Sequence, residues 1–211
     1  MQAMNLALFQ WLGAGHSPHP ELLSFARLVA EYASWLCFAL LGVAAWRQPG
    51  QRGYAMGVLV AAAAASLAAH ALADHFGVPR PFAIGLSRSY VEHGARGSLP
   101  SAHASVMFSA ALILCLRPAL RRLGLVMFAL ALLTGWARVY LGLHFPLDIV
   151  AGLALAMVTA ALFQMLWLLA RRFLAPRLTA AALERSARPE LPPRPNRNGR
   201  PDRPAADSLG A

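Results

Sequence analysis

The chain has 211 residues, of which 58% are apolar and only 13% are charged, and its mean hydropathy is +0.50. A soluble domain carries about 25% charged residues, so this composition excludes an ordinary globular protein in water and a chain that is disordered throughout. All 19 basic residues are arginine and the formal net charge is +10, which would favour nucleic-acid binding only if the arginines gathered on one soluble face.

Residues 1–20 contain no arginine or lysine, so we expect no secretory signal there, because such a signal starts with positive charge. Within this segment, residues 4–12 are predicted to form a short amphipathic helix that lies in the membrane interface.

Five apolar stretches follow and predict helices that cross a membrane, since a helical span needs about 20 mostly apolar residues. In chain order they are residues 29–46, 54–73, 102–116, 123–137 and 147–170. The third is short and needs Ser101 and the residues before it to complete a span. None of the five has the charged face that a soluble helical bundle presents to water. The sequence therefore predicts an all-α fold, a polytopic membrane helix bundle of about five transmembrane helices.

The composition changes after residue 175. Residues 176–211 hold seven of the 15 prolines and seven of the 19 arginines, without aromatic side chains or apolar periodicity. Such a composition is typical of disorder. We therefore predict two parts, a membrane-embedded domain over residues 1–175 and a Pro/Arg-rich disordered cytoplasmic tail over residues 176–211.

The placement of arginine orients the bundle. Arginines cluster in alternate connections and after the last span, at Arg47 and Arg52, at Arg117, Arg121 and Arg122, and at Arg171, Arg172 and Arg177. Because positive charge marks the cytoplasmic side of a membrane, we expect the loops at residues 76–100 and 140–146 to face outward. The basic excess is then a topology signal, and we expect no nucleic-acid partner.

The outward loop at residues 76–100 breaks this charge rule, because it holds Arg80, Arg88 and Arg96. Arginines that oppose the topology signal indicate an anionic ligand on that face. Arg80 stands between two prolines in an extended segment, where its guanidinium can bind two phosphate oxygens at once. The alternative is an arginine that is simply solvated.

A second polar string, Pro100-Ser101-Ala102-His103, stands where the third apolar helix begins. A helix N-terminus offers unpaired N–H groups and binds phosphate readily. Ser101 is expected to donate to a bound anion, with His103 in the first turn pointing at the same anion. The alternative is a capping serine and an interfacial histidine without a ligand.

The third polar string runs from Arg138 at the end of the fourth span, through His144 in the loop, to Asp148 at the start of the fifth. Asp148 lies four residues after His144, so its carboxylate can hold one imidazole nitrogen and make the other a better nucleophile or base. The alternative is an acid that complements the helix dipole.

Two other classes of protein fit some of these residues. A transporter would need ionisable groups threaded through several spans, whereas here they gather at one end of the helices, His70 excepted. A zinc site could use His93, His103, His144 and Asp148, but the neighbouring arginines would repel a cation.

Together the three strings resemble the type 2 phosphatidic acid phosphatase superfamily. Its signature has three parts: Lys–six residues–Arg-Pro, Pro-Ser-Gly-His, and Ser-Arg–five residues–His–three residues–Asp. The matching residues are Arg80-Pro81, then Pro100, Ser101 and His103, then Arg138, His144 and Asp148. The surrounding residues are similar to the bacitracin-resistance branch, the undecaprenyl-diphosphate phosphatases.

The chain departs from that signature at three positions. Ala73 stands where the first motif has lysine, and Ala102 and Ala137 replace the glycine and serine of the other two. The missing lysine leaves one phosphate-binding cation unaccounted for. The candidates to replace it are Arg88, Arg96 and His75.

The resemblance implies a phosphatase that uses no metal and no other cofactor. His144 would attack the terminal phosphorus and become phosphohistidine, while Asp148 orients it. His103 would protonate the leaving oxygen and then assist water. Arg80, Arg138 and Ser101 would bind the phosphate oxygens.

The substrate so implied is a polyprenyl diphosphate, undecaprenyl diphosphate, whose hydrolysis recycles the carrier lipid of cell-wall synthesis. The alternative within the same chemistry is a phosphatase of phosphatidate, phosphatidylglycerophosphate or lipid A. The resemblance places the protein in the bacterial cytoplasmic membrane with its site facing the periplasm or cell exterior. It implies no obligate protein partner.

Overall fold

The computed structural model of the chain describes residues 2–15, 17–88, 90–91, 94 and 97–173. The chain divides into two units, Met1–Leu169 and Ala170–Ala211, and only residues 170–173 of the second are described. The tail predicted over residues 176–211 therefore lies outside the described residues, and the domain boundary after residue 175 stays a prediction.

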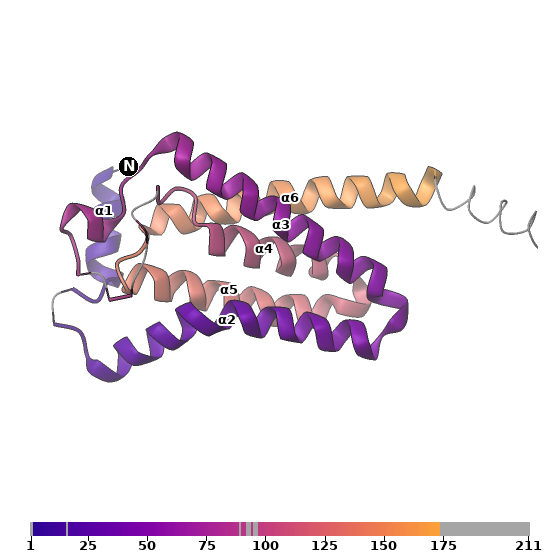
Figure 1. Cartoon of the computed structure of the whole chain (residues 1–211), viewed down its shortest axis with the longest axis horizontal. Helices are drawn as coiled ribbons and strands as arrows, with labels where there is room; N and C mark the ends of the chain where they lie inside the picture. The colour runs from indigo at the N-terminus through magenta and orange to yellow at the C-terminus, as the bar shows by residue number, and fades with distance from the viewer. Residues whose placement is uncertain (1, 16, 89, 92–93, 95–96, 174–211) are drawn as a thin grey trace, which may run out of the picture. The chain divides into compact units, whose positions relative to one another are not determined.

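Every regular element in the described ranges is helical. The α-helices are α1 (Gln2–Leu12), α2 (Pro20–Arg47), α3 (Arg52–Phe76), α4 (Ala102–Cys115), α5 (Arg121–Tyr140) and α6 (Pro146–Phe173) (Figure 1). Short 3-10 turns, η1 (Pro49–Gln51), η2 (Pro81–Ile84) and η3 (Pro118–Leu120), join some of them. The five predicted stretches are confirmed as helices. Only α2 begins well before its predicted start, because Pro20 and Glu21 suit the first turn of a helix.

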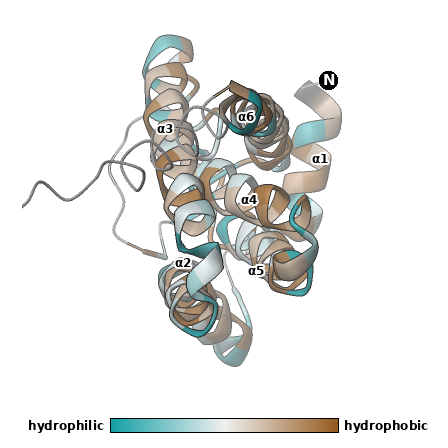
Figure 2. Ribbon diagram, turned by 90° about the vertical axis from the view of Figure 1, so that its right-hand side faces the viewer, coloured by the Kyte–Doolittle hydropathy of each residue, from teal (hydrophilic) through white to brown (hydrophobic). Residues whose placement is uncertain are grey.

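Four of these helices, α2, α3, α5 and α6, are long and apolar enough to cross a membrane. At 1.5 Å per residue the 14-residue α4 is only about 21 Å long, which is shorter than the hydrocarbon core of about 30 Å. Only 17% of the most apolar part of α6 is buried, and Figure 2 shows apolar residues on outward as well as inward helix faces. Such surfaces suit lipid rather than water.

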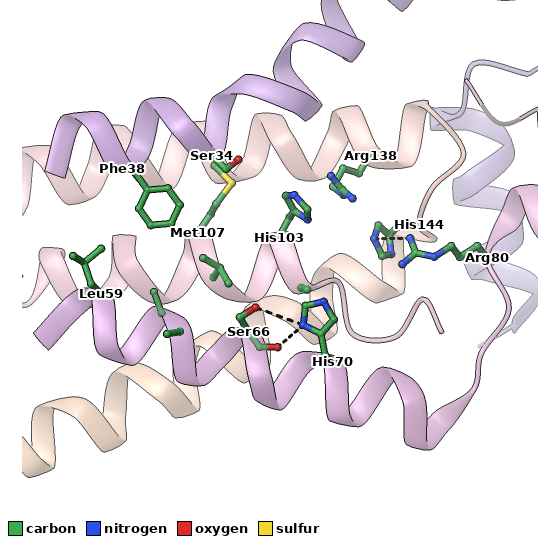
Figure 3. Close-up of a pocket in the computed structure, with 14 residues that line it drawn as sticks. Ser34, Phe38, Leu59, Ser66, His70, Arg80, His103, Met107, Arg138 and His144 are labelled. Carbon is green, nitrogen blue, oxygen red and sulfur yellow. Dashed lines mark hydrogen bonds between the residues drawn. The ribbon is translucent and has the colours of Figure 1, made fainter. Parts of the chain in front are cut away.

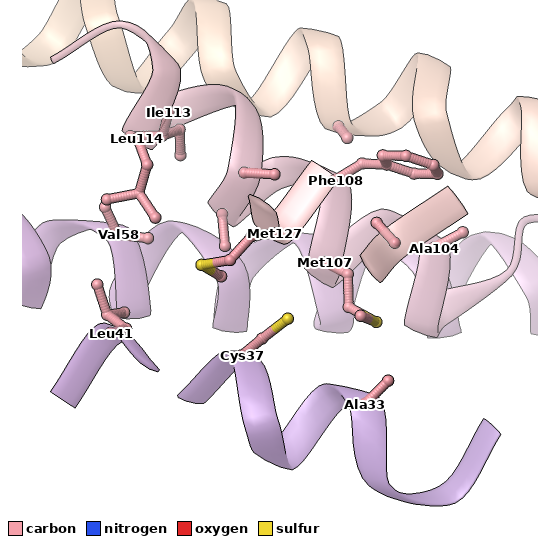
Figure 4. Close-up of a cluster of buried hydrophobic side chains, with 14 of the residues drawn as sticks. Ala33, Cys37, Leu41, Val58, Ala104, Met107, Phe108, Ile113, Leu114 and Met127 are labelled. Atoms are coloured by element: carbon pink, nitrogen blue, oxygen red, sulfur yellow. The ribbon is translucent and has the colours of Figure 1, made fainter. Parts of the chain in front are cut away.

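The core of the first unit is built around α4, which packs against α3 and α5, while α2 packs against α5. Phe108, Ile113 and Leu114 of α4 are fully buried and meet Val58 of α3 and Met127 of α5 in one cluster (Figure 4). Because lipid tails are as apolar as these side chains, close packing rather than removal from water holds such a core together.

Small residues bring α6 close to α4. Gly152, Ala156 and Ala160, four residues apart, form the buried stripe of α6. A Cβ on Gly152 would lie only 2.8 Å from the Cβ of Ala104 and 3.0 Å from the carbonyl oxygen of Ser101. Because the starts of α4 and α6 lie this close, the Ser101 N–H donates to the Asp148 carbonyl at 3.0 Å. This hydrogen bond joins the two segments that carry the predicted site residues Ser101 and Asp148.

The helix predicted over residues 4–12 is present as α1. Its Phe9 ring packs edge-on against Phe145, with centroids 5.3 Å apart. The Asn5 side-chain oxygen accepts a hydrogen bond from the Leu147 N–H at 3.0 Å, which satisfies one of the unpaired donors of the first turn of α6. The N-terminal helix therefore fixes the loop that contains His144.

The tight approach at Gly152 predicts an unusual response to alanine. In a helix Gly→Ala normally stabilises by about 1 kcal/mol, and we expect that at Gly42 of α2, where nothing lies near the added Cβ. At Gly152 the added methyl overpacks the α4 contact, which costs about 1–3 kcal/mol. Thermal unfolding in detergent should therefore show a lower Tm for Gly152→Ala than for Gly42→Ala. Equal Tm values would contradict the close α4–α6 contact.

Candidate active site

His144 lies in the loop between α5 and α6 and is only 2% exposed. Its Nδ1 is 3.3 Å from the Asp148 Oδ2, and the same oxygen accepts a hydrogen bond from the Phe145 N–H at 2.8 Å. Because the carboxylate can only accept, Nδ1 carries the proton and the lone pair is on Nε2. The loop thus presents one imidazole tautomer with Nε2 as the reactive atom.

Arg80 faces that reactive atom. Its Nη1 lies 3.2 Å from the His144 Nε2 and donates to the Leu143 carbonyl at 3.1 Å, while Nη2 donates to the Gly97 carbonyl at 3.4 Å. Arg80 itself has an extended backbone directly before η2, and the proline that follows it restricts that conformation. A guanidinium fixed this close to an imidazole lone pair is well placed to bind an anion that meets that nitrogen.

The pKa of His144 is lowered to about 4, first because burial disfavours the charged ring. The cationic side chains of Arg138 and Arg80 lower it further, and the hydrogen bond to Asp148 opposes them. The imidazole is therefore neutral near pH 7, and its Nε2 lone pair is available to act as a base or nucleophile.

His144 shares a cavity of about 440 Å³ with the other predicted basic residues. Arg80, His103 and Arg138 also line it, and Figure 3 shows their side chains directed into the same space. Arg138, at the end of α5, is 4% exposed, and His103 belongs to the first turn of α4. Segments 64 residues apart in the chain, from Arg80 to His144, thus meet at one end of the bundle.

The lining of this cavity is polarised. At one end are two arginines and three histidines, and no acidic residue belongs to the described lining. The opposite end is formed by small and apolar side chains, including Phe38 of α2, Leu59 and Ala62 of α3, and Met107 of α4 (Figure 3). The cavity is therefore suited to a molecule with an anionic head and an apolar tail.

Ser101 lies apart from these lining residues. It is fully buried, and its N–H and carbonyl are used in bonds to Asp148 and Ser105. Its Oγ has no hydrogen-bond partner among the described residues and does not line the 440 Å³ cavity. The phosphate-binding role predicted for Ser101 is therefore still a prediction, whereas its backbone clearly ties α4 to α6.

The side chains proposed to replace the first-motif lysine divide into two groups. Arg88 and His75 are exposed and do not line the cavity that holds His144. Arg96 lies outside the described residues, as does His93 of the zinc alternative. In the part of the chain that is described, no three His, Cys, Asp or Glu side chains are grouped so as to hold a metal ion.

The structure adds one histidine to the lining that no motif assigned. His70 of α3 faces the cavity, and its Nδ1 lies 2.7 Å from the backbone oxygen of Ser66. It stands one helical turn before Ala73. The spacing of His70 and Ala73 was the only feature of the sequence that indicated a place for His70 near the site, since residues three apart share a helix face.

Comparison with known proteins agrees with this architecture. The family profile described as PAP2 superfamily matches residues 54–172. YbjG of Escherichia coli (strain K12), named as a candidate undecaprenyl-diphosphatase, is 31% identical over 172 residues, covering 79% of this chain and 84% of that protein. The undecaprenyl-diphosphatase BcrC of Bacillus subtilis (strain 168) is 26% identical over 163 residues, covering 76% and 82%.

Two solved structures share the fold. The crystal structure of Aquifex aeolicus LpxE has a TM-score of 0.62 at 23% identity and covers 77% of this chain and 95% of its own. A transmembrane PAP2-type phosphatidylglycerolphosphate phosphatase from Bacillus subtilis has a TM-score of 0.62 at 20% identity, covering 82% and 88%. The fold is therefore that of multi-span membrane proteins.

The buried position of His144 predicts an abnormal titration. An ordinary histidine is mostly protonated at about pH 6, whereas we expect His144 to stay neutral there, with the proton on Nδ1. ¹⁵N spectra of histidine-labelled protein in micelles would test this, with His144→Gln identifying the signal. Removal of a cation in Arg80→Met should move the pKa upward. A His144 ring that is doubly protonated at about pH 6 in the unaltered protein would contradict this view of the site.

Proposed function

The chain belongs to the PAP2 superfamily, and from this premise we propose that it is a membrane lipid phosphatase that removes the terminal phosphate of undecaprenyl diphosphate. The observation that carries the proposal is the neutral His144, held through Nδ1 by Asp148 and facing Arg80 through Nε2. This arrangement lies in a cavity whose other end is apolar. The names of two relatives, YbjG and BcrC, point to the same substrate.

The reaction proceeds in two displacements at phosphorus. His144 Nε2 attacks the terminal phosphorus, the bond from phosphorus to the bridging oxygen breaks, and His103 gives its proton to the leaving polyprenyl phosphate. Water then attacks the phosphohistidine and His103 takes the proton from that water. The phosphorus–nitrogen bond breaks, which releases inorganic phosphate and restores His144.

The remaining site residues stabilise charge. Arg80 and Arg138 stand beside His144 and bind the oxygens of the transferring phosphoryl group, where positioning and charge stabilisation provide most of the catalysis. In the ligand-free protein Arg80 contacts the His144 Nε2 itself. When the phosphate binds, the Arg80 guanidinium donates to the phosphate oxygens instead, and the Nε2 lone pair becomes available for attack. The first turn of α4 adds hydrogen-bond donors.

The apolar walls accept the lipid. The apolar end of the 440 Å³ cavity is lined by residues such as Phe38, Leu59 and Met107. An isoprenoid chain is long, apolar and without polar groups, so it fits this lining better than a water-soluble phosphate ester does.

Charge at the helix ends supports an outward-facing site. Arg117 Nε donates to the Gln51 side-chain oxygen at 2.9 Å, so the loops that follow α2 and α4 meet at one end of the bundle. Arginines concentrate in these loops, which assigns that end to the cytoplasm. The cavity with His144 lies toward the other end of α3, so we propose that it faces the periplasm or cell exterior.

Phosphate release from purified protein in detergent micelles tests the proposal. Undecaprenyl diphosphate, phosphatidate, phosphatidylglycerophosphate and a lipid A precursor would be compared with a chelator present. We expect kcat/KM to be highest for undecaprenyl diphosphate. His144→Ala should lose at least about 1,000-fold and Asp148→Asn about 100-fold, while His19→Ala, an exposed residue before α2, should keep full activity. Preference for any other lipid of the panel would overturn the substrate assignment.

A leaving-group comparison tests the role of His103. The leaving group of farnesyl phosphate is an alkoxide, which needs a proton to depart. The leaving group of 4-nitrophenyl phosphate is a phenolate, which is stable without one. We expect His103→Gln to lower kcat/KM for farnesyl phosphate by about 100-fold and for 4-nitrophenyl phosphate much less. An equal loss on both esters would show that His103 does not protonate the leaving group.

A further inference from the structure

His70 of α3 is a cavity-lining side chain that the reaction described above does not use. It is exposed, lines the 440 Å³ cavity, and also borders an adjoining cavity of about 270 Å³ that reaches Arg80. Figure 3 shows its ring on the opposite side of the cavity from Arg138, with His103 between them. Because α3 carries none of Arg80, His103, Arg138 and His144, His70 reaches the cavity from a separate wall.

The hydrogen bonds of His70 leave one nitrogen for a ligand. Nδ1 lies 2.7 Å from the Ser66 carbonyl oxygen and 3.5 Å from the Ser66 Oγ. A carbonyl oxygen can only accept, so Nδ1 carries a proton. Nε2 has no hydrogen-bond partner among the described residues, and in the imidazolium form it donates to an anionic oxygen. The bond to Ser66 keeps the ring from turning away, as a binding residue requires.

The position of His70 along the cavity indicates which part of a substrate it meets. Figure 3 shows a sequence from the apolar lining at Leu59 and Phe38, through His70 and His103, to His144 and Arg80. We consider a prenyl diphosphate with its tail among the apolar residues and its terminal phosphorus at His144. Its other phosphate then lies between these two ends, beside His70 and His103.

We propose that His70 is a specificity-determining residue that binds the phosphate remaining on the lipid and so favours diphosphates over monophosphates. This inference rests on the proposed function. His103 delivers the proton to the bridging oxygen from α4, and His70 holds the oxygens of the lipid-side phosphate from α3. In a prenyl monophosphate that second phosphate is absent, so His70 then has no anion to bind.

The test compares farnesyl diphosphate with farnesyl phosphate, which share the tail and the transferred phosphoryl group. A hydrogen bond to a charged group contributes enough that its loss lowers kcat/KM by about 10- to 100-fold. We expect His70→Ala to show that loss on the diphosphate and less than about a threefold change on the monophosphate. His70→Gln, which keeps a donor, should recover part of the preference. His75→Ala is the matched control, because His75 is an exposed histidine of the same helix that lines neither cavity.

The outcomes separate this inference from the proposed function. An equal loss on both substrates would assign His70 to the structure of α3 and overturn its role in specificity, and so would an unchanged kcat/KM on the diphosphate. Unaltered protein that hydrolyses neither prenyl substrate would overturn the proposed function together with this inference. A normal rate for the unaltered protein with no selective effect of His70→Ala would overturn the role of His70 alone.

Discussion

The hydrogen bond between His144 Nδ1 and Asp148 is the interaction on which the rest of the site depends. It selects the tautomer, aims Nε2 at Arg80 and, through the shared bond to the Phe145 N–H, fixes the loop between α5 and α6. Burial then keeps the ring neutral in spite of that acid. A buried imidazole without its carboxyl partner would be free to rotate, and Arg80 would no longer face a fixed nitrogen.

The fold places this pair in a cavity whose other end is apolar. Close packing at Gly152 binds the start of α6 to the start of α4, so that Asp148 and His103 belong to neighbouring turns. The cavity then extends from these polar turns to apolar residues of α2 and α3. A charged head and a hydrocarbon tail thus find matching surroundings in one space, which explains why ionisable residues are tolerated at the end of a membrane bundle.

Much of this could be predicted from the sequence, for identifiable reasons. The helices follow from uninterrupted apolar runs, and His144 and Asp148 were predicted to interact because they lie only four residues apart. The surroundings of Ser101 were harder to predict, because its N–H donates to the Asp148 carbonyl and Ser101 does not line the main cavity. That depends on how closely α6 approaches α4. His70 carried no motif at all, and its place on the cavity wall emerges only when α3 is packed beside α4.

The identity of the nucleophile is tested most directly by trapping the covalent intermediate. Purified protein would be mixed briefly with prenyl diphosphate labelled with ³²P at the terminal phosphate, then quenched in base and digested. We expect an acid-labile, base-stable label on the peptide that contains residue 144, and no such label in His144→Ala. Label on another residue, or full turnover by His144→Ala, would contradict it.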